Sequence, residues 1–527
     1  MSMTPFTGQW TKTEAAHLLK RTMFGATNQQ ILDAVSNGLS STVTSLLQIP
    51  SVSPPLAYDS DETIATIGTT WVNSVYPTDP QDSQKVENTR QRSLASWTIQ
   101  RLNEEQFSIA EKMCLFWQNH FAAISEFDAR GSYDYHMLIR SHALGNFKQL
   151  VKDMTINPNM LIFLNGASNN VYSPNENYAR ELLELYTIGK GPQIGPGDYT
   201  NYTEQDVAAG AKILTGFTLE GLRSDTITDV TSVFDYQRHD TTIKSLSAHF
   251  GNAVIPNNGG NEYAYFIDII FQQDEVANHI CRKLYRYFVN YDITSSIETN
   301  VIAELASTLI ANNYEILPVL EELFKSQHFY DISVRGAIIR GPLDLFFSMF
   351  NSTQTKPDFT LETNYKMRLS LYYYATILGQ NYIDPPSVAG WTAFYQEPSF
   401  SKLWINSTNL KNRFDFSAWT ALYGGLSQDN ENLVFNVLDF LDNLSFPDNS
   451  ELVIEDIIDV FFPKGTDSTT KSVLKDILNN GQPDFEWTIQ YNDYLSNLGD
   501  PVYSDPVKQR VNLVLNEIFH MPQFHVM

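Results

Sequence analysis

Apolar residues recur every three or four positions along most of this 527-residue chain, and this spacing limits the fold more than any other feature. In the segment 28–47, for example, Ile31, Val35, Leu39 and Val43 fall on one face of a helix. Strand patterns do not alternate with helical ones, so a parallel sheet is not expected. The sequence therefore predicts a mainly α fold, in which many helices pack into a large globular unit.

Two segments depart from the helical pattern. Residues 217–262 are rich in β-branched residues, aspartates and glycines, which predicts a small β-hairpin insertion. Residues 50–85 are rich in Ser, Pro, Thr and Asp and are expected to form a long loop. We expect a helical domain over 1–420 and a helical C-terminal subdomain over 421–527 that packs on it. The predicted helices are 11–24, 28–47, 86–105, 107–123, 129–153, 175–188, 204–215, 263–289, 297–312, 315–327, 335–350, 363–381, 430–445, 451–461, 469–479 and 505–520.

The composition excludes several classes of partner. A net charge of −25 argues against a nucleic-acid partner, because phosphate neutralisation needs clustered Lys and Arg. No apolar run reaches the roughly 18 residues that a transmembrane helix needs. Cys114 and Cys281 each lie in an apolar helical pattern, so two buried free thiols are favoured over a disulfide. Cationic ligands and divalent metals remain compatible with this composition.

The segment 174–189 carries the clearest candidate site. Glu176, Arg180 and Glu184 are four residues apart, so their side chains are expected to form a ladder on one helix face. The ladder is either a structural ion-pair network or one wall of a polar site. In a site, the two carboxylates would suit acid–base chemistry and Arg180 would bind an anion. Two more residues of this segment are candidate substrate-binding groups: Asn175 and Glu181.

Histidines mark two further candidates. His120 lies on a largely apolar helix face next to Asn119, where it is either a hydrogen-bonded core residue or a catalytic group. His239 and Asp240 fall in an irregular segment shortly before Lys244. A His-Asp pair in a loop is compatible with general base catalysis or metal ligation, and equally with a turn that Asp240 stabilises.

Two more features have a structural and a functional interpretation. Trp391 could anchor a rigid turn or stack on a sugar ring. Arg282, Lys283 and Arg286 form a basic helix face, for which ion pairs with the surplus carboxylates are the simpler interpretation. The chain contains no P-loop, dinucleotide fingerprint, GxSxG or HExxH sequence, which removes the common hydrolases, kinases, dehydrogenases and zincins.

Eight stretches occur in an order that resembles a known family. They are AAHLLKRTMFGAT (15–27), EKMCLFWQNHFA (111–122), RSHALGNFKQLVKDMTINPNMLIFLNG (140–166), PNENYARELLELYTIG (174–189), YTEQDVAAGAKILTGFT (202–218), HDTTIK (239–244), ICRKLYRYFV (280–289) and PPSVAGW (385–391). The chain resembles the large bacterial family called domain of unknown function eighteen hundred. The resemblance implies a large, mostly helical protein and a periplasmic or extracellular location, although the N-terminus lacks the apolar segment of a signal peptide. The family usually has a second histidine at the position of Gln118, so a metal site there is in doubt.

Two functional hypotheses follow. In the first, His120, the 176–184 ladder, His239 and Asp240 line one pocket of an envelope enzyme, which performs acid–base hydrolysis or elimination on an anionic glycan or related polymer. The loop 189–198 would then border this pocket as a lid. In the second, the protein is a non-catalytic surface or assembly protein, and these charges hold helices together. A polysaccharide or another envelope protein is the expected partner, and a divalent metal is the one cofactor considered.

Overall fold

The computed structural model describes residues 3–125 and 127–527. Helices dominate this part of the chain, which confirms the mainly α prediction. Its strands form four two-stranded antiparallel sheets, so the expected absence of a parallel sheet holds for the described residues.

The first half of the chain forms short and medium helices. Threonines precede two of them: Thr11 stands before the first helix, and Thr203 forms a capping box with Asp206. The helices are α1 (Lys12–Thr22), α2 (Asn28–Leu46), α3 (Pro80–Asn103), α4 (Ala110–Phe121), α5 (Ala129–Ser141), α6 (Phe147–Thr155), α7 (Pro158–Phe163), α8 (Asn177–Glu181) and α9 (Glu204–Ile213).

The predicted hairpin insertion is confirmed as two separate hairpins. Strand β3 (Phe217–Glu220) pairs with β4 (Thr231–Phe234), and β5 (Lys244–Ser245) pairs with β6 (Val254–Ile255). Two hairpins that were not predicted also occur. One joins β1 (Gln193–Gly195) to β2 (Asp198–Tyr199), and the other joins β7 (Leu426–Gln428) to β8 (Glu431–Leu433).

Helices make up most of the remaining chain. They are α10 (Glu262–Ile270), α11 (Asp274–Phe288), α12 (Ser295–Ile297), α13 (Ala303–Ala311), α14 (Ile316–Lys325), α15 (Pro342–Ser352), α16 (Leu361–Ile377), α17 (Thr392–Tyr395), α18 (Ser407–Leu422), α19 (Val437–Asp442), α20 (Ser450–Phe461), α21 (Ser468–Asn479), α22 (Asp484–Ser496) and α23 (Pro501–His520). No helix among the described residues is long and apolar enough to cross a membrane.

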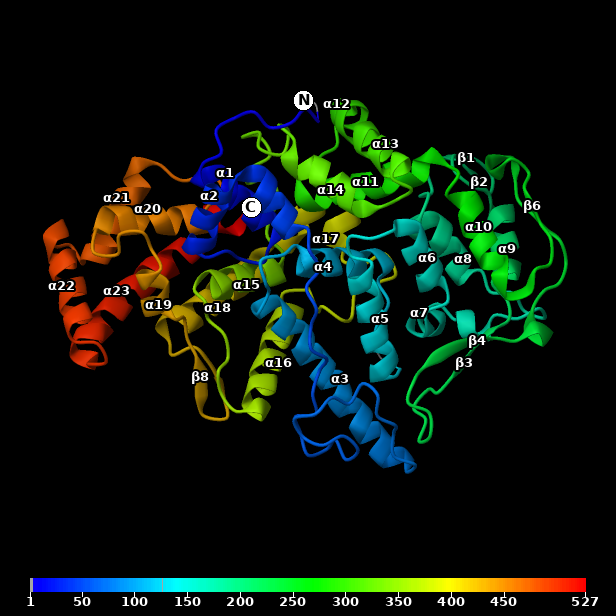
Figure 1. The fold of residues 1–527 in the computed structure, drawn as a ribbon, viewed down its shortest axis with the longest axis horizontal. Helices are drawn as coiled ribbons and strands as arrows, with labels where there is room; N and C mark the ends of the chain where they lie inside the picture. The colour runs from blue at the N-terminus through cyan, green and yellow to red at the C-terminus, as the bar shows by residue number, and fades with distance from the viewer. Residues whose placement is uncertain (1–2, 126) are drawn as a thin grey trace.

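The molecule is elongated, and its ends differ in character (Figure 1). Helices α20 to α23 lie at one end, and the hairpins β1 to β6 with α8, α9 and α10 lie at the other. Helices α4, α15 and α17 lie near the middle, close to the C-terminus of the chain. One continuous hydrophobic core runs through the molecule, from Leu18 in α1 to Leu515 in α23. A smaller hydrophobic cluster around Trp71 and Trp97 packs the loop that was predicted over 50–85 against α3. The loop is shorter than predicted, because α3 begins at Pro80.

Several predicted helices need correction. The helix expected over 129–153 is two helices, because Asn146 leaves the helical conformation and its side chain caps α6 by accepting from the Gln149 amide. Helix α22 was not predicted, since it buries only a few aromatic side chains, such as Trp487 and Tyr491, among polar ones. The region expected as one helix over 430–445 begins instead with β8.

The most important correction concerns the segment 175–188. It begins as α8 but continues as a π-helix over Leu182–Tyr186, in which each turn holds more residues than an α-helix. Four-residue spacing therefore no longer places side chains on one face beyond Glu181. The last backbone carbonyls of this segment have no partner within the helix, as at any helix end, and are free to accept from other residues.

Candidate functional site

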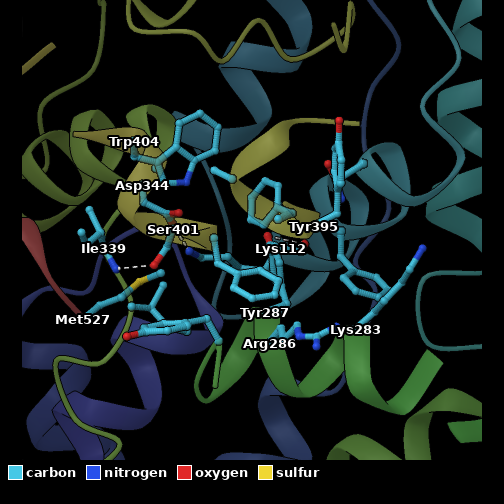
Figure 2. A pocket seen from close by; sticks show the side chains of 18 of the residues that line it. Lys112, Lys283, Arg286, Tyr287, Ile339, Asp344, Tyr395, Ser401, Trp404 and Met527 are labelled. Atoms are coloured by element: carbon cyan, nitrogen blue, oxygen red, sulfur yellow. Dashed lines mark hydrogen bonds and ion pairs between the residues drawn. The ribbon is translucent and has the colours of Figure 1, made fainter. Parts of the chain in front are cut away.

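A pocket lies near the middle of the molecule, bordered by α4, α11, the segment 338–344 and the segment 389–404. The space between these residues is narrow and partly open to solvent. Figure 2 shows Asp344, Ser401 and Trp404 on one side of it and Lys283 with Arg286 on another. Seven aromatic side chains contribute to its walls: Phe116, Tyr287, Tyr291, Phe394, Tyr395, Phe400 and Trp404.

Positive charge is concentrated around this pocket although the chain as a whole is acidic. The cationic lining residues are Arg21, Lys112, Lys283 and Arg286, against one acidic lining side chain, Asp344. Lys112 and Asp344 form a buried ion pair. Arg286 pairs with Glu397 at 3.3 Å, so Arg21 and Lys283 are the lining cations without a carboxylate partner among the described residues.

Arg21 is the least satisfied of these cations. Its side chain comes from α1 and is 2% exposed. One terminal nitrogen donates to the Val334 carbonyl at 2.6 Å, whereas Nε and the other terminal nitrogen have no acceptor among the described residues. Burial lowers the pKa of Arg21 to about 9, and Asp344 only partly opposes this. A buried guanidinium without a paired carboxylate is costly, so Arg21 calls for an explanation.

Two more arginines lie behind the same carboxylate. Burial lowers the pKa of Arg340 and of Arg413 to about 10, and in each case the charge of Asp344 opposes the shift. Arg340 and Arg413 donate mainly to backbone carbonyls. In Arg413, Nε and one terminal nitrogen have no partner in the described chain. Two further buried arginines are therefore close enough to Asp344 to be affected by its charge, although neither lines the pocket.

His120 and Lys283 join the pocket to the end of the π-helix. The Nε2 atom of His120 lies 3.1 Å from the Tyr186 carbonyl, and its Nδ1 lies 3.2 Å from Nζ of Lys283. Lys283 also donates to the Leu185 carbonyl at 2.9 Å. Burial, followed by the charge of Lys283, keeps the pKa of His120 well below its usual value. His120 is therefore a neutral histidine at pH 7, hydrogen-bonded on both ring nitrogens.

Asn119 and Trp391 meet at the edge of the pocket. The Asn119 side-chain oxygen accepts from the Trp391 backbone amide at 2.9 Å, and a Cβ at Gly390 would lie only 2.2 Å from that oxygen. The Trp391 side chain is buried, and its indole N–H has no acceptor among the described residues. Here a glycine with φ of +84° lets the chain approach α4 closely.

The charged ladder is organised differently from the prediction. Arg180 pairs with Glu176 at 2.9 Å and with both oxygens of Glu204 at 2.8 Å, on the surface of the molecule. Glu184 instead contacts Lys190 and accepts from the Tyr202 hydroxyl. The π-helix explains the separation, since it turns Glu184 away from the face of Arg180.

The segment 174–189 also contains the two candidate substrate-binding residues, Asn175 and Glu181. Asn175 accepts from the Asn177 amide and so stabilises the turn before α8. Glu181 is half-buried, and burial together with the nearby charge of Glu184 raises its pKa. The expected lid, residues 189–198, forms the exposed β1–β2 hairpin and does not line the pocket in the described chain.

His239, Asp240 and Lys244 belong to a closed cluster around Glu262. His239 Nε2 lies 2.9 Å from one Glu262 oxygen, and Lys244 Nζ lies 2.6 Å from the other. The side chains of His239, Lys244 and Glu262 are fully buried. Asp240 accepts from the Thr242 amide, as in the turn that the sequence allowed. This cluster joins the two hairpins to α10. Both oxygens of Glu262 are already paired with protein groups, and the three side chains are not accessible to a ligand from solvent.

Of the residues expected to share one cavity, His120 lines the pocket, and the ladder, His239 and Asp240 do not; Asn119, next to His120 in the sequence, also lines it. Within the described chain no group of three His, Cys, Asp or Glu side chains could hold a metal ion. Gln118 donates to the Ala123 carbonyl. Cys114 and Cys281 are buried free thiols, as expected.

The sequence analysis missed Arg21, Lys112 and Asp344. Each is a charged residue within an apolar helical stretch, and that mismatch was the available signal. The residues of the basic face of α11 also differ in their partners. Arg282 pairs with Glu275 and Glu298, as the simpler interpretation predicted, whereas Lys283 contacts no carboxylate in the described part of the chain.

Comparison with known proteins identifies a family without a function. The model of the family described as "Protein of unknown function (DUF1800)" matches residues 17–526, so the chain belongs to this family and the suspected resemblance is confirmed. Neither a curated protein nor a solved structure shows significant similarity to the chain.

Proposed function

We propose that this member of the DUF1800 family binds an anionic ligand in the central pocket. The observation that carries the proposal is Arg21, a buried guanidinium that lines the pocket with two nitrogens lacking an acceptor among the described residues. An anion would supply the missing acceptors through charge-assisted hydrogen bonds. It would also offset the charge of Arg21, which has no paired carboxylate among the described residues.

The surroundings of the cations indicate the kind of ligand. Aromatic side chains form much of the wall, and such surfaces favour a ligand with an apolar or ring-shaped body. A saccharide that carries a carboxylate fits this description and agrees with the anionic glycan expected from the sequence. The net charge of −25 repels anions in general, so only a local cluster of cations can hold one.

Acid–base cleavage by two carboxylates receives less support at this pocket. Asp344 is the one acidic side chain among its lining residues, and it is paired with Lys112. Glu176 and Glu184 contact Arg180 and Lys190 elsewhere. Their roles in catalysis remain predictions.

A second candidate is the structural protein without a ligand. The closed cluster of His239, Lys244 and Glu262 supports it, because that motif is satisfied without any substrate. In this case ordered water would occupy the pocket, and anions would bind no better than neutral sugars.

Binding measurements separate the two candidates. We expect glucuronate and inorganic sulfate to bind with measurable heat in titration calorimetry, and glucose to give none. Arg21→Gln should weaken glucuronate binding at least about tenfold, since charge-assisted hydrogen bonds are lost. Arg92→Gln removes an exposed arginine and serves as the charge-matched control. Equal affinity of both variants and the wild type, or no binding of either anion, would contradict the proposal.

A further inference from the structure

We propose that Lys283 is a nucleophilic amine that forms an imine with the carbonyl group of an anionic ligand, such as a 2-oxo acid. This inference rests on the proposed function, because the pocket cations would hold the carboxylate while Lys283 meets the carbonyl. Lys283 lies beside Arg286 at one edge of the pocket (Figure 2).

The contacts of Lys283 show which hydrogens of its amine group are engaged in hydrogen bonds and whether its lone pair is free. Nζ lies 2.9 Å from the Leu185 carbonyl and 3.2 Å from His120 Nδ1. His120 Nε2 faces the Tyr186 carbonyl, which can only accept, so the ring hydrogen is on Nε2 and Nδ1 has a lone pair. A neutral Lys283 therefore donates both of its hydrogens to these two acceptors. The third position of the nitrogen, its lone pair, has no partner among the described residues.

The π-helix supplies these acceptors. The carbonyls of Leu185 and Tyr186 lie in its last turn, where carbonyls have no partner within the helix, and they accept from Lys283 and His120. His279 also contacts the Leu185 carbonyl, at 3.3 Å. Local π-helical turns occur frequently at functional sites, and this one fixes the orientation of the amine.

The charges around Lys283 favour the neutral form. The titratable groups that face it are His120 from α4 and His279 and Arg286 from α11, with no carboxylate in the described part of the chain. Burial and the charge of Arg286 lower the pKa of Lys283 to about 7. Nucleophilic lysines are activated in this way, by loss of solvent and by a neighbouring cation.

The reaction needs no further reagent. The Lys283 lone pair attacks the carbonyl carbon, and the carbon–oxygen π bond breaks as the carbon–nitrogen bond forms. His120 Nδ1 is placed to take a proton from Nζ and pass it to the carbonyl oxygen. The second hydrogen of the amine then leaves with that oxygen, so one water is released and a carbon–nitrogen double bond remains.

Reductive trapping tests the inference on the unmodified full chain. The protein is incubated at pH 7 with glyoxylate and sodium cyanoborohydride, and carboxymethyl-lysine is located by peptide mass spectrometry. We expect Lys283 to react at least about tenfold faster than Lys85, whose side chain is 62% exposed. The reason is that a pKa of about 7 leaves roughly half of the Lys283 amines neutral.

Two internal controls make the result specific. Burial also lowers the pKa of Lys20 to about 7, but that residue donates to the Asp459 and Phe462 carbonyls and does not line the pocket. Lys20 should therefore stay unlabelled. With acetaldehyde, which has no carboxylate, the labelling rate of Lys283 should exceed that of Lys85 by much less than with glyoxylate.

The outcomes distinguish this inference from the proposed function. If glucuronate binds but Lys283 reacts no faster than Lys85, the imine proposal is wrong and anion binding stands. If acetaldehyde labels Lys283 with the same preference as glyoxylate and glucuronate does not bind, delivery by the anion site is refuted. Lys283→Met should abolish the fast labelling, whereas Arg92→Gln, which lies outside the pocket, should retain it.

Discussion

Replacement of Arg21 by methionine should stabilise the free protein, although Arg21 is among its most buried side chains. The pKa of Arg21 falls from 12.5 to about 9, mainly through burial. A shift of roughly 3.5 units corresponds to about 5 kcal/mol of native-state cost for keeping the charge at pH 7. Methionine removes that cost and fills a similar apolar volume.

One interaction opposes this gain. The Val334 carbonyl loses its hydrogen bond from Arg21, which costs about 1.5–3 kcal/mol. We therefore expect Arg21→Met to raise the free energy of unfolding by about 2–3.5 kcal/mol, and to abolish the stabilisation that glucuronate gives the wild type. Equilibrium unfolding in urea at pH 7, with and without glucuronate, measures both effects.

Arg90 provides the matched control, since it is equally buried but fully paired. It binds both oxygens of Glu62 and the Ser74 and Val75 carbonyls. Arg90→Met leaves Glu62 buried and unpaired, so a loss of about 3–5 kcal/mol is expected. If Arg21→Met destabilises the protein as much as Arg90→Met does, Arg21 is a structural residue and the reasoning fails.

Three further predictions concern the other charged groups. Arg180→Ala should cost only about 0–1 kcal/mol in urea unfolding, because its partners Glu176 and Glu204 are solvent-exposed, and a larger loss would point to a buried role. Glu262→Gln should cost about 3–5 kcal/mol by the same assay, because it leaves the buried Lys244 without its carboxylate, and a neutral result would contradict the closed cluster. The lowered pKa of Lys283 disfavours its charged form in the native state, so this penalty is full below about pH 7 and disappears as the pH rises to 10.5. Wild-type stability relative to Lys283→Met should thus increase between these pH values, and a flat difference would show that the amine keeps its ordinary pKa.

Local chemistry made much of the fold predictable. The capping boxes at Thr11 and Thr203 depend on residues three positions away, Glu14 and Asp206, so they follow from local sequence. The β-branched segment 217–262 likewise predicted hairpins through its own composition. The π-helix at Leu182–Tyr186 has no comparable signal, and the ladder prediction failed there because it assumed α-helical spacing throughout.

Long-range pairing accounts for what the sequence analysis missed at the site. Lys112 and Asp344 are 232 residues apart, and no local pattern indicates that they meet. Arg180 pairs with Glu204 and not with Glu184 for the same reason, because the packing of α8 against α9 brings Glu204 close to it. His120 was recognised as a candidate, but its contact with the end of the predicted helix runs through the Tyr186 backbone carbonyl, which side-chain patterns do not encode.

The most direct test of an anion in the central pocket is anomalous diffraction from crystals grown in the presence of selenate. The account predicts an anomalous peak inside the pocket, within hydrogen-bond distance of the unpaired nitrogens of Arg21. The peak should disappear in crystals of Arg21→Gln. A pocket that contains only water, with selenate bound elsewhere on the surface, would contradict the account.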